Sequence, residues 1–192
     1  MKPLFALGLG ALLGVAISNL PLIAAHAHMA INHGRSNASG TDQPKVLHTL
    51  QTFSLVAKAP MQVVAPLLGA DKERAWSPGW NPEFLWPTEP SDRPGMVFTV
   101  AHGHKTVVWV NTTFDLDRGR IQYVYVIPDI MVTLITLTVT PEGQQTRVAV
   151  EYARTALNPD ANDLVQQQAD KDATEGPEWE KQINDHLKGS AQ

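Results

Sequence analysis

The middle of the chain alternates between apolar and polar residues with a period of two, which is typical of β-strands that bury one face. The alternating stretches cover residues 96–102, 106–114, 119–127, 130–140 and 146–156. Only a few residues, rich in Gly, Pro and Asp, separate one stretch from the next. Connections this short require neighbouring strands to pair antiparallel. The pattern therefore predicts an antiparallel meander.

A weaker alternation over residues 46–57 predicts a first or edge strand before the meander. Pro60 then suits the first turn of a helix, because its ring fixes φ and its missing N–H has no helical partner there. Apolar residues follow at helical spacing from Val63 to Leu68, until Gly69 breaks the pattern. Two short helices fit this segment better than one long helix.

The C-terminal part of the chain is polar and has helical composition up to Gly189. Trp179, Ile183 and Leu187 recur every four residues, so they form one apolar face of a helix that packs on the sheet. A Gly-Pro pair at 176–177 lies inside this stretch, and proline removes a backbone donor and clashes with the preceding turn. We therefore expect two helical pieces or a sharp kink.

Residues 75–87 contain three of the five tryptophans and also three prolines, which prevent a regular helix. A buried aromatic side chain hides about 150–250 Å² of mostly apolar surface, so this segment needs an apolar partner. We interpret it as a rigid aromatic cover over one face of a curved sheet. It closes either a cavity or an ordinary core.

Composition excludes several functions. The net charge is −4 and the pI is near 5.9, with no long run of Lys or Arg, so nucleic acid is not expected as a partner. The chain has no cysteine, which excludes disulfides, thiolate nucleophiles and cysteine metal ligands. Its 192 residues have room for one domain of ordinary size and an appendage.

The first 27 residues resemble a secretory signal. Lys2 precedes an apolar run from residue 3 to 25, and small residues around Ala27 fit a cleavage site. The run is nearly long enough to cross a hydrocarbon core of about 30 Å, so an uncleaved anchor that associates the protein with a membrane is the alternative.

The polar residues 28–44 cannot bury enough surface to fold alone and predict a flexible linker before a domain at 45–189. The expected location is outside the cytoplasm, either periplasmic or secreted, with an N-terminal membrane anchor as the alternative to cleavage. If translation begins at Met29, the product is cytoplasmic instead.

Catalytic patterns are scarce. The sequence has no Gly-x-Ser-x-Gly elbow, no His-Glu-x-x-His motif and no phosphate-binding glycine loop. The sharpest candidate for acid–base or metal chemistry is His102-Gly103-His104, which lies at a predicted hairpin turn without a third ligand. We therefore assign no catalytic residue and no metal ligand, and we expect no cofactor.

Two neighbouring strands of the meander carry an apolar wall with a few polar groups. Residues of like parity share one face of a strand: these are Val107, Trp109, Asn111 and Thr113 on the first, and Ile121, Tyr123, Tyr125 and Ile127 on the second. Such a lining suits a pocket for a hydrophobic small molecule. The alternative is that the C-terminal helix fills the same space with its own side chains.

Several strings of this sequence resemble a known family. The most specific is Trp-x-Pro-Gly-Trp-x-Pro-Glu-Phe at residues 76–84; the others lie at 59–68, 73–85, 95–99, 106–110, 120–124 and 146–152. Through them the chain from about 47 to 187 resembles the SRPBCC superfamily of START-like, helix-grip proteins, which includes polyketide cyclase/dehydrase-like and lipid-transfer proteins. The resemblance implies an α+β fold in which an antiparallel sheet curves around a long C-terminal helix, with two short helices after the first strand.

The same resemblance implies a deep hydrophobic cavity between sheet and helix that binds or transports a lipid, sterol or polyketide-like molecule. The residues expected to line or gate it are Trp76, Trp80, Phe84, Trp109, Tyr123, Tyr125 and Tyr152. An alternative is a polyketide cyclase/dehydrase-like enzyme, which needs a titratable group inside the cavity. A third interpretation is a scaffold whose interior is fully packed.

Overall fold

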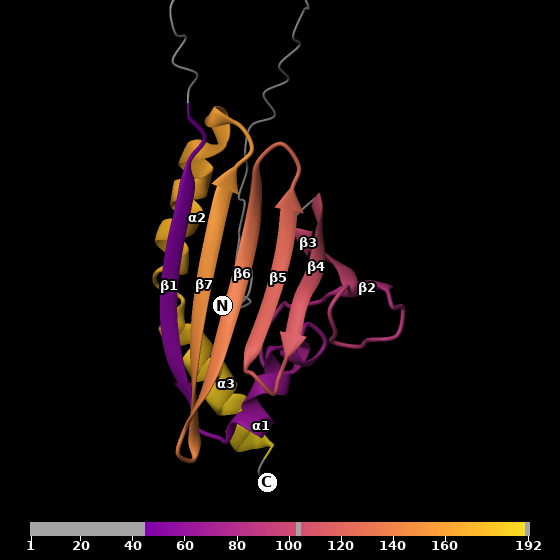
Figure 1. Cartoon of the computed structure of the whole chain (residues 1–192), viewed down its shortest axis with the longest axis vertical. Helices are drawn as coiled ribbons and strands as arrows, with labels where there is room; N and C mark the ends of the chain where they lie inside the picture. Colours follow the sequence, from indigo (N-terminus) through magenta and orange to yellow (C-terminus); the bar gives the residue numbers. More distant parts are fainter. Residues whose placement is uncertain (1–44, 103–104, 191–192) are drawn as a thin grey trace, which may run out of the picture.

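The computed structural model describes residues 45–102 and 105–190. The strands are β1 (His48–Ala57), β2 (Glu83–Trp86), β3 (Val97–His102), β4 (Lys105–Asp115), β5 (Arg120–Ile127), β6 (Met131–Glu142) and β7 (Gln145–Ala156). Between β1 and β2 lie α1 (Met61–Val64) and the 3-10 helices η1 (Ala65–Leu68) and η2 (Lys72–Ala75); after β7 follow η3 (Pro159–Ala161), α2 (Asn162–Asp172) and α3 (Gly176–Gly189) (Figure 1).

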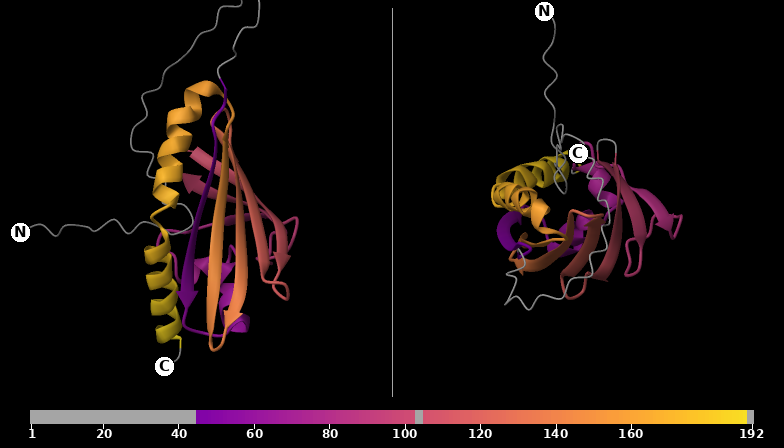
Figure 2. Two further views of the ribbon diagram at one scale, coloured as in Figure 1. Left: turned by 60° about the vertical axis from the view of Figure 1, so that its left-hand side comes forward. Right: turned by 90° about the horizontal axis from the view of Figure 1, so that it is seen from above.

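The strands form one antiparallel sheet in the order β1-β7-β6-β5-β4-β3-β2. The first strand therefore pairs with the last one, at the edge opposite β2. Helix α2 lies against β1 and β7, and α3 lies against β1. Figure 2 shows the sheet curving around both helices, which occupy its inner face.

This arrangement confirms the predicted α+β, helix-grip fold, and the strands of the meander lie within a few residues of their expected bounds. One expectation was incomplete. The aromatic segment 75–87 contains strand β2, in which Phe84 pairs with Phe98 and Trp86 with Val97. Its prolines flank the strand and do not interrupt it, so the segment extends the edge of the sheet as well as covering it.

The break in the C-terminal helix occurs where the Gly-Pro pair predicted it. Helix α2 ends at Asp172, and α3 starts at Gly176 with Pro177 in its first turn. A Cβ on Gly176 would lie 3.2 Å from the Phe53 ring, so a glycine permits this close approach to β1. Trp179 is fully buried, as the apolar face of the predicted helix required.

The predictions for residues 1–27 and 28–44, and for Gly103 and His104 of the histidine motif, lie outside the described residues. None of the described helices is both long enough and apolar enough to cross a membrane.

Candidate functional site

One row of paired residues crosses the inner face of the whole sheet, and we call it the inner row. Its members are successive register partners on β2, β3, β4, β5, β6, β7 and β1: Phe84, Phe98, Trp109, Tyr125, Thr133, Arg154 and Thr49. The row is aromatic from β2 to β5 and polar from β6 to β1. The interior therefore has an apolar end and a polar end.

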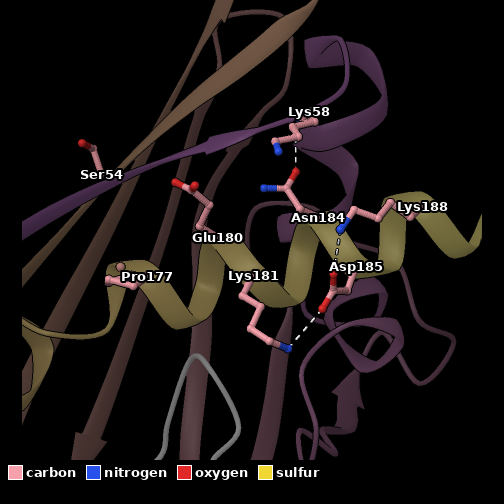
Figure 3. A pocket seen from close by; sticks show the side chains of 9 residues that line it. Ser54, Lys58, Pro177, Glu180, Lys181, Asn184, Asp185 and Lys188 are labelled. Carbon is pink, nitrogen blue, oxygen red and sulfur yellow. Dashed lines mark hydrogen bonds and ion pairs between the residues drawn. The ribbon is translucent and has the colours of Figure 1, made fainter.

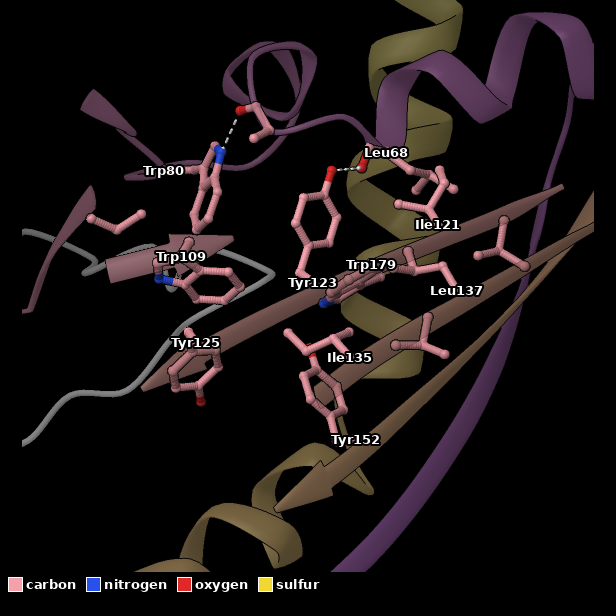
Figure 4. Close-up of a cluster of buried hydrophobic side chains, with 14 of the residues drawn as sticks. Leu68, Trp80, Trp109, Ile121, Tyr123, Tyr125, Ile135, Leu137, Tyr152 and Trp179 are labelled. Carbon is pink, nitrogen blue, oxygen red and sulfur yellow. Dashed lines mark hydrogen bonds between the residues drawn. The ribbon is translucent and has the colours of Figure 1, made fainter. Parts of the chain in front are cut away.

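At the apolar end the rings of the inner row stack on one another. Trp109 lies 4.3 Å from Tyr125 and 5.7 Å from Phe98, both in stacked geometry. Trp80, from the aromatic segment, meets Trp109 edge-on at 5.7 Å. Its indole N–H donates to the Ala70 carbonyl at 2.7 Å, which fixes the ring over the row (Figure 4). The aromatic segment thus closes the interior as a rigid cover.

A small hollow remains beneath this cover. Its lining consists of Ala70, Glu73, Trp80, Phe98, Trp109 and Tyr123, and it is too narrow to admit a water molecule. The Tyr123 hydroxyl donates to the Leu68 carbonyl at 3.1 Å, as Figure 4 shows. Glu73 is fully buried, so the hollow has a carboxyl group in its wall.

Several polar groups of the interior lack hydrogen-bond partners among the described residues. They include the Trp109 indole N–H and the Tyr152 hydroxyl. Burial raises the pKa of the Tyr123 hydroxyl, and the charges of Asp92 and Glu73 raise it further. A hydrogen bond with Asn111 counteracts part of this rise. A buried donor without an acceptor is costly.

The polar end is built around Arg154. Its Nε and Nη2 atoms donate to the two carboxylate oxygens of Asp172 at 2.6 and 2.7 Å, and Nη1 donates to Thr133 Oγ1 at 2.9 Å and also to the Tyr125 hydroxyl. The guanidinium carbon lies 4.9 Å from the centre of the Tyr152 ring. Arg154 thereby joins α2 to the sheet through a fully buried ion pair.

A second carboxyl group, Glu175, lies beside this pair at the junction of α2 and α3. Burial and, to a smaller extent, the charge of Asp172 together raise the pKa of Glu175 to about 7. Lys171, a hydrogen bond with Trp179 and the charge of Arg154 act in the opposite direction. This end of the interior therefore changes its charge near neutral pH.

Most of the predicted site residues meet inside the domain. Trp80, Trp109 and Tyr123 surround the hollow, whereas Tyr125 and Tyr152 lie beside Arg154. The other two lie apart from these groups: Trp76 packs 5.6 Å from Trp179, and the half-buried Phe84 packs 6.0 Å from Phe98 at the edge of the sheet. Their role as ligand-binding residues remains a prediction.

The interior also differs from the expected one. The resemblance implied a deep cavity, but the interdigitating rings fill most of that space and leave the small hollow. The sequence analysis also missed Glu73, Arg154, Asp172 and Glu175. Arg154 had a signal, because it continues the inward-facing alternation that includes Tyr152. Glu73 had none, because its neighbours Lys72 and Arg74 are typical of solvated surface.

A larger depression of about 390 Å³ lies outside the interior, where α3 meets β1 (Figure 3). Here Asn184 accepts a hydrogen bond from the Lys58 amide at 2.7 Å and donates one to the Val56 carbonyl at 3.0 Å. Glu180 accepts from the Val56 amide at 3.0 Å. These side chains satisfy the free edge of β1, so we assign the depression a structural role.

No family model matches the chain, and no curated protein matches it. Solved structures do. An aromatase/cyclase from a Streptomyces species has a TM-score of 0.55 at 13% identity, over 76% of this chain and 97% of that one. A Thermus thermophilus protein has a TM-score of 0.53 at 16% identity, over 75% and 100%. Norcoclaurine synthase from Thalictrum flavum, in complex with dopamine and hydroxybenzaldehyde, has a TM-score of 0.51 at 12% identity, over 74% and 87%.

These likenesses concern the fold, because the identities are low. The chain has a helix-grip fold, as the sequence analysis predicted, and the SRPBCC superfamily remains a resemblance. Its function has to be argued from its own residues.

Proposed function

We propose that this chain binds an apolar small molecule between the inner row and the helices α2 and α3. The observation that carries the proposal is the hollow at the aromatic end of the inner row, which is lined by Trp109, whose buried indole N–H lacks a partner. Aromatic surface supplies affinity, and a few polar groups fix the orientation of a ligand. A lipid, a sterol or a polyketide-like molecule has the required chemistry.

Binding requires the interior to expand, and α2 is the element that moves. Its buried face consists of Val165, Gln168, Ala169 and Asp172, so Val165 is its largest fully buried apolar side chain. Such a face loses little apolar contact when the helix separates from β7. The ligand therefore enters beside Arg154 and reaches the aromatic end from there.

Titration of tryptophan fluorescence with a fatty acid, a sterol and an aromatic polyketide tests this proposal. We expect at least one of them to change the indole emission and to raise the melting temperature, since a ligand at 100 times its Kd stabilises the folded state by about 2.7 kcal/mol. Trp109→Phe, which removes one unpartnered N–H, should weaken the binding of an oxygen-bearing ligand. Thr140→Ala, on the exposed surface, is the matched control. No response to any of the three compounds contradicts the proposal.

A polyketide cyclase/dehydrase-like enzyme is the second candidate, because a carboxyl group and a phenol face the same hollow. Glu73 and Tyr123 are both buried there, and they are groups that can transfer protons. Turnover of a linear polyketide, followed by chromatography, tests the candidate. Glu73→Gln should abolish turnover and retain binding; binding without turnover in the unmodified protein supports the carrier alone.

A further inference from the structure

Arg154 brings a positive charge into the interior of the domain. Of residues 45–101 and 106–190, it is the only basic residue whose side chain is buried. It lies at the polar end of the inner row, beside the place where the ligand of the proposed function enters. A guanidinium in an apolar interior requires a counter-ion. The partners of Arg154 therefore decide which molecules this end of the interior accepts.

The sheet holds the guanidinium in a fixed orientation. Its Nη1 atom donates to the Thr133 hydroxyl at 2.9 Å and to the Tyr125 hydroxyl, both from neighbouring strands. The Nε and Nη2 atoms donate to the two oxygens of Asp172 at 2.6 and 2.7 Å. In this two-pronged geometry arginine binds a carboxylate most strongly. The sheet therefore carries a preformed carboxylate site, which Asp172 occupies.

The site and its occupant belong to different parts of the fold. Arg154 is on β7, whereas Asp172 is the last residue of α2, the helix expected to move when a ligand enters. Burial raises the pKa of Asp172 more than its contacts with Arg154 lower it. The Asp172 carboxylate therefore gains solvation when α2 separates, but Arg154 is left without a counter-ion. A ligand that brings its own carboxylate removes that penalty.

Apolar surface begins directly beside the site. The Tyr125 ring, whose hydroxyl accepts from Arg154, stacks 4.3 Å from Trp109, which lines the hollow. From Arg154 to Trp109 the inner row crosses three strand spacings, which is about 14 Å. The fully buried Tyr152 hydroxyl lacks a partner among the described residues, and its ring lies 4.9 Å from the guanidinium carbon. A charged head fits at this end of the row, and an apolar tail fits along the rest.

We propose, on the basis of the function proposed above, that the ligand is an apolar molecule with a carboxylate head, whose two oxygens replace those of Asp172 on Arg154 when α2 separates. The tail enters first and lies along Tyr125 and Trp109. The head remains at the entrance, where the Nε and Nη2 atoms of Arg154 donate to it. Exchange of one carboxylate for another leaves the charge around Arg154 unchanged.

Other head groups fit this site less well. The hydroxyl of an alcohol or a sterol would leave the guanidinium without a counter-ion. A phosphate would bring more negative charge than the departure of Asp172 removes, and Glu175 already lies beside the pair. The charges of the site therefore favour a head with a single negative charge.

Titration with a matched pair of probes tests the proposal. Dodecanoic acid and dodecanol share a tail of about the length of the path from Arg154 to Trp109 and differ in the head. At neutral pH, where the acid is ionised, it should bind the wild type at least about tenfold more tightly than the alcohol. The double variant Arg154→Met, Asp172→Leu, which has lost the carboxylate site, should bind both probes equally. Tryptophan emission measures the affinities, and circular dichroism checks that each variant is folded.

Asp172→Asn should act in the opposite direction. It removes the internal competitor and leaves Arg154 unpaired, so dodecanoic acid should bind it about tenfold more tightly than it binds the wild type. The acid should also raise the melting temperature of this variant more than the alcohol does. An ion pair with a structural role alone gives no such gain. Asp170→Asn makes the same charge change at an exposed position of α2 and should leave both affinities unchanged.

Three results overturn the carboxylate site: equal affinities for acid and alcohol in the wild type, a preference for the acid that persists in the double variant, and no gain in Asp172→Asn. If the sterol or the aromatic polyketide binds and dodecanoic acid does not, the proposed function stands and only the carboxylate site fails. If none of these compounds binds, both fail.

Discussion

Helices α2 and α3 lie in line on the same sheet, but different chemistry attaches them. Trp179 and Ile183 anchor α3 with large apolar side chains that are fully buried, and Asn184 bonds the β1 backbone. In α2 the only fully buried apolar side chains are Val165 and Ala169, and its strongest link is the ion pair between Asp172 and Arg154.

The difference separates a permanent part of the core from a part that can open. Exposing an apolar contact to water is unfavourable, whereas a charged pair that leaves the interior regains hydration. Accordingly we expect α3 to remain in place and α2 to move when a ligand enters. Four measurements test this comparison.

The largest effect is expected in α3. Trp179→Ala removes an indole that contacts Phe53 at 5.3 Å and Trp76 at 5.6 Å, and the cavity left behind should cost about 3–5 kcal/mol of the free energy of unfolding. Urea denaturation measures it. Lys181→Ala, exposed on the same helix, should stay within about 0.5 kcal/mol of the wild type. A loss below 1 kcal/mol in the tryptophan variant would show that Trp179 does not anchor α3 to the core.

A slightly smaller loss is expected in α2. Asp172→Asn leaves the buried Arg154 without its counter-ion and should cost about 3 kcal/mol, near the lower end for broken buried pairs, since Tyr125 and Thr133 still accept from the guanidinium. The double variant Arg154→Met, Asp172→Leu should regain most of this loss. If the double variant is as unstable as the single one, the ion pair does more than fasten α2.

The junction between the helices should respond to pH. Glu175 has a pKa of about 7 in the folded state against 4.5 as the ordinary value, so the folded state binds the proton more tightly. Stability is then full below about pH 4.5 and falls as the pH rises to about 7. With allowance for solvent screening, the loss should be about 1–2 kcal/mol. Glu175→Gln should remove this slope in urea titrations at pH 4 and 8, and an unchanged slope would locate the titrating group elsewhere.

The smallest effect concerns the edge of β1. Asn184→Ala deletes the two hydrogen bonds with Val56 and Lys58 and should cost about 1–2 kcal/mol. Hydrogen exchange of the Lys58 amide, which loses its acceptor, should accelerate more than that of amides in β5. Equal exchange in both strands would show that α3 does not cap this edge.

Local pattern was enough for much of this fold. Alternation of apolar and polar residues identified β3 to β7, because a strand points every second side chain toward the core and this period can be recognised in consecutive residues. The break before α3 followed from Pro177, whose ring is incompatible with a helix interior. The burial of Trp76 and Trp80 agreed with the apolar surface of the indole, whereas Trp86 on the edge strand β2 is 55% exposed.

Long-range pairing decided the rest. Register placed Arg154 in one row with Trp109, and the turn of the C-terminal chain brought Asp172 to it. No local pattern records which distant side chain will neutralise a buried charge, or how completely rings from separate segments will fill a cavity. Sequence alone therefore determined the elements and the fold, while only the tertiary structure decided the buried charges of the interior and the size of the hollow.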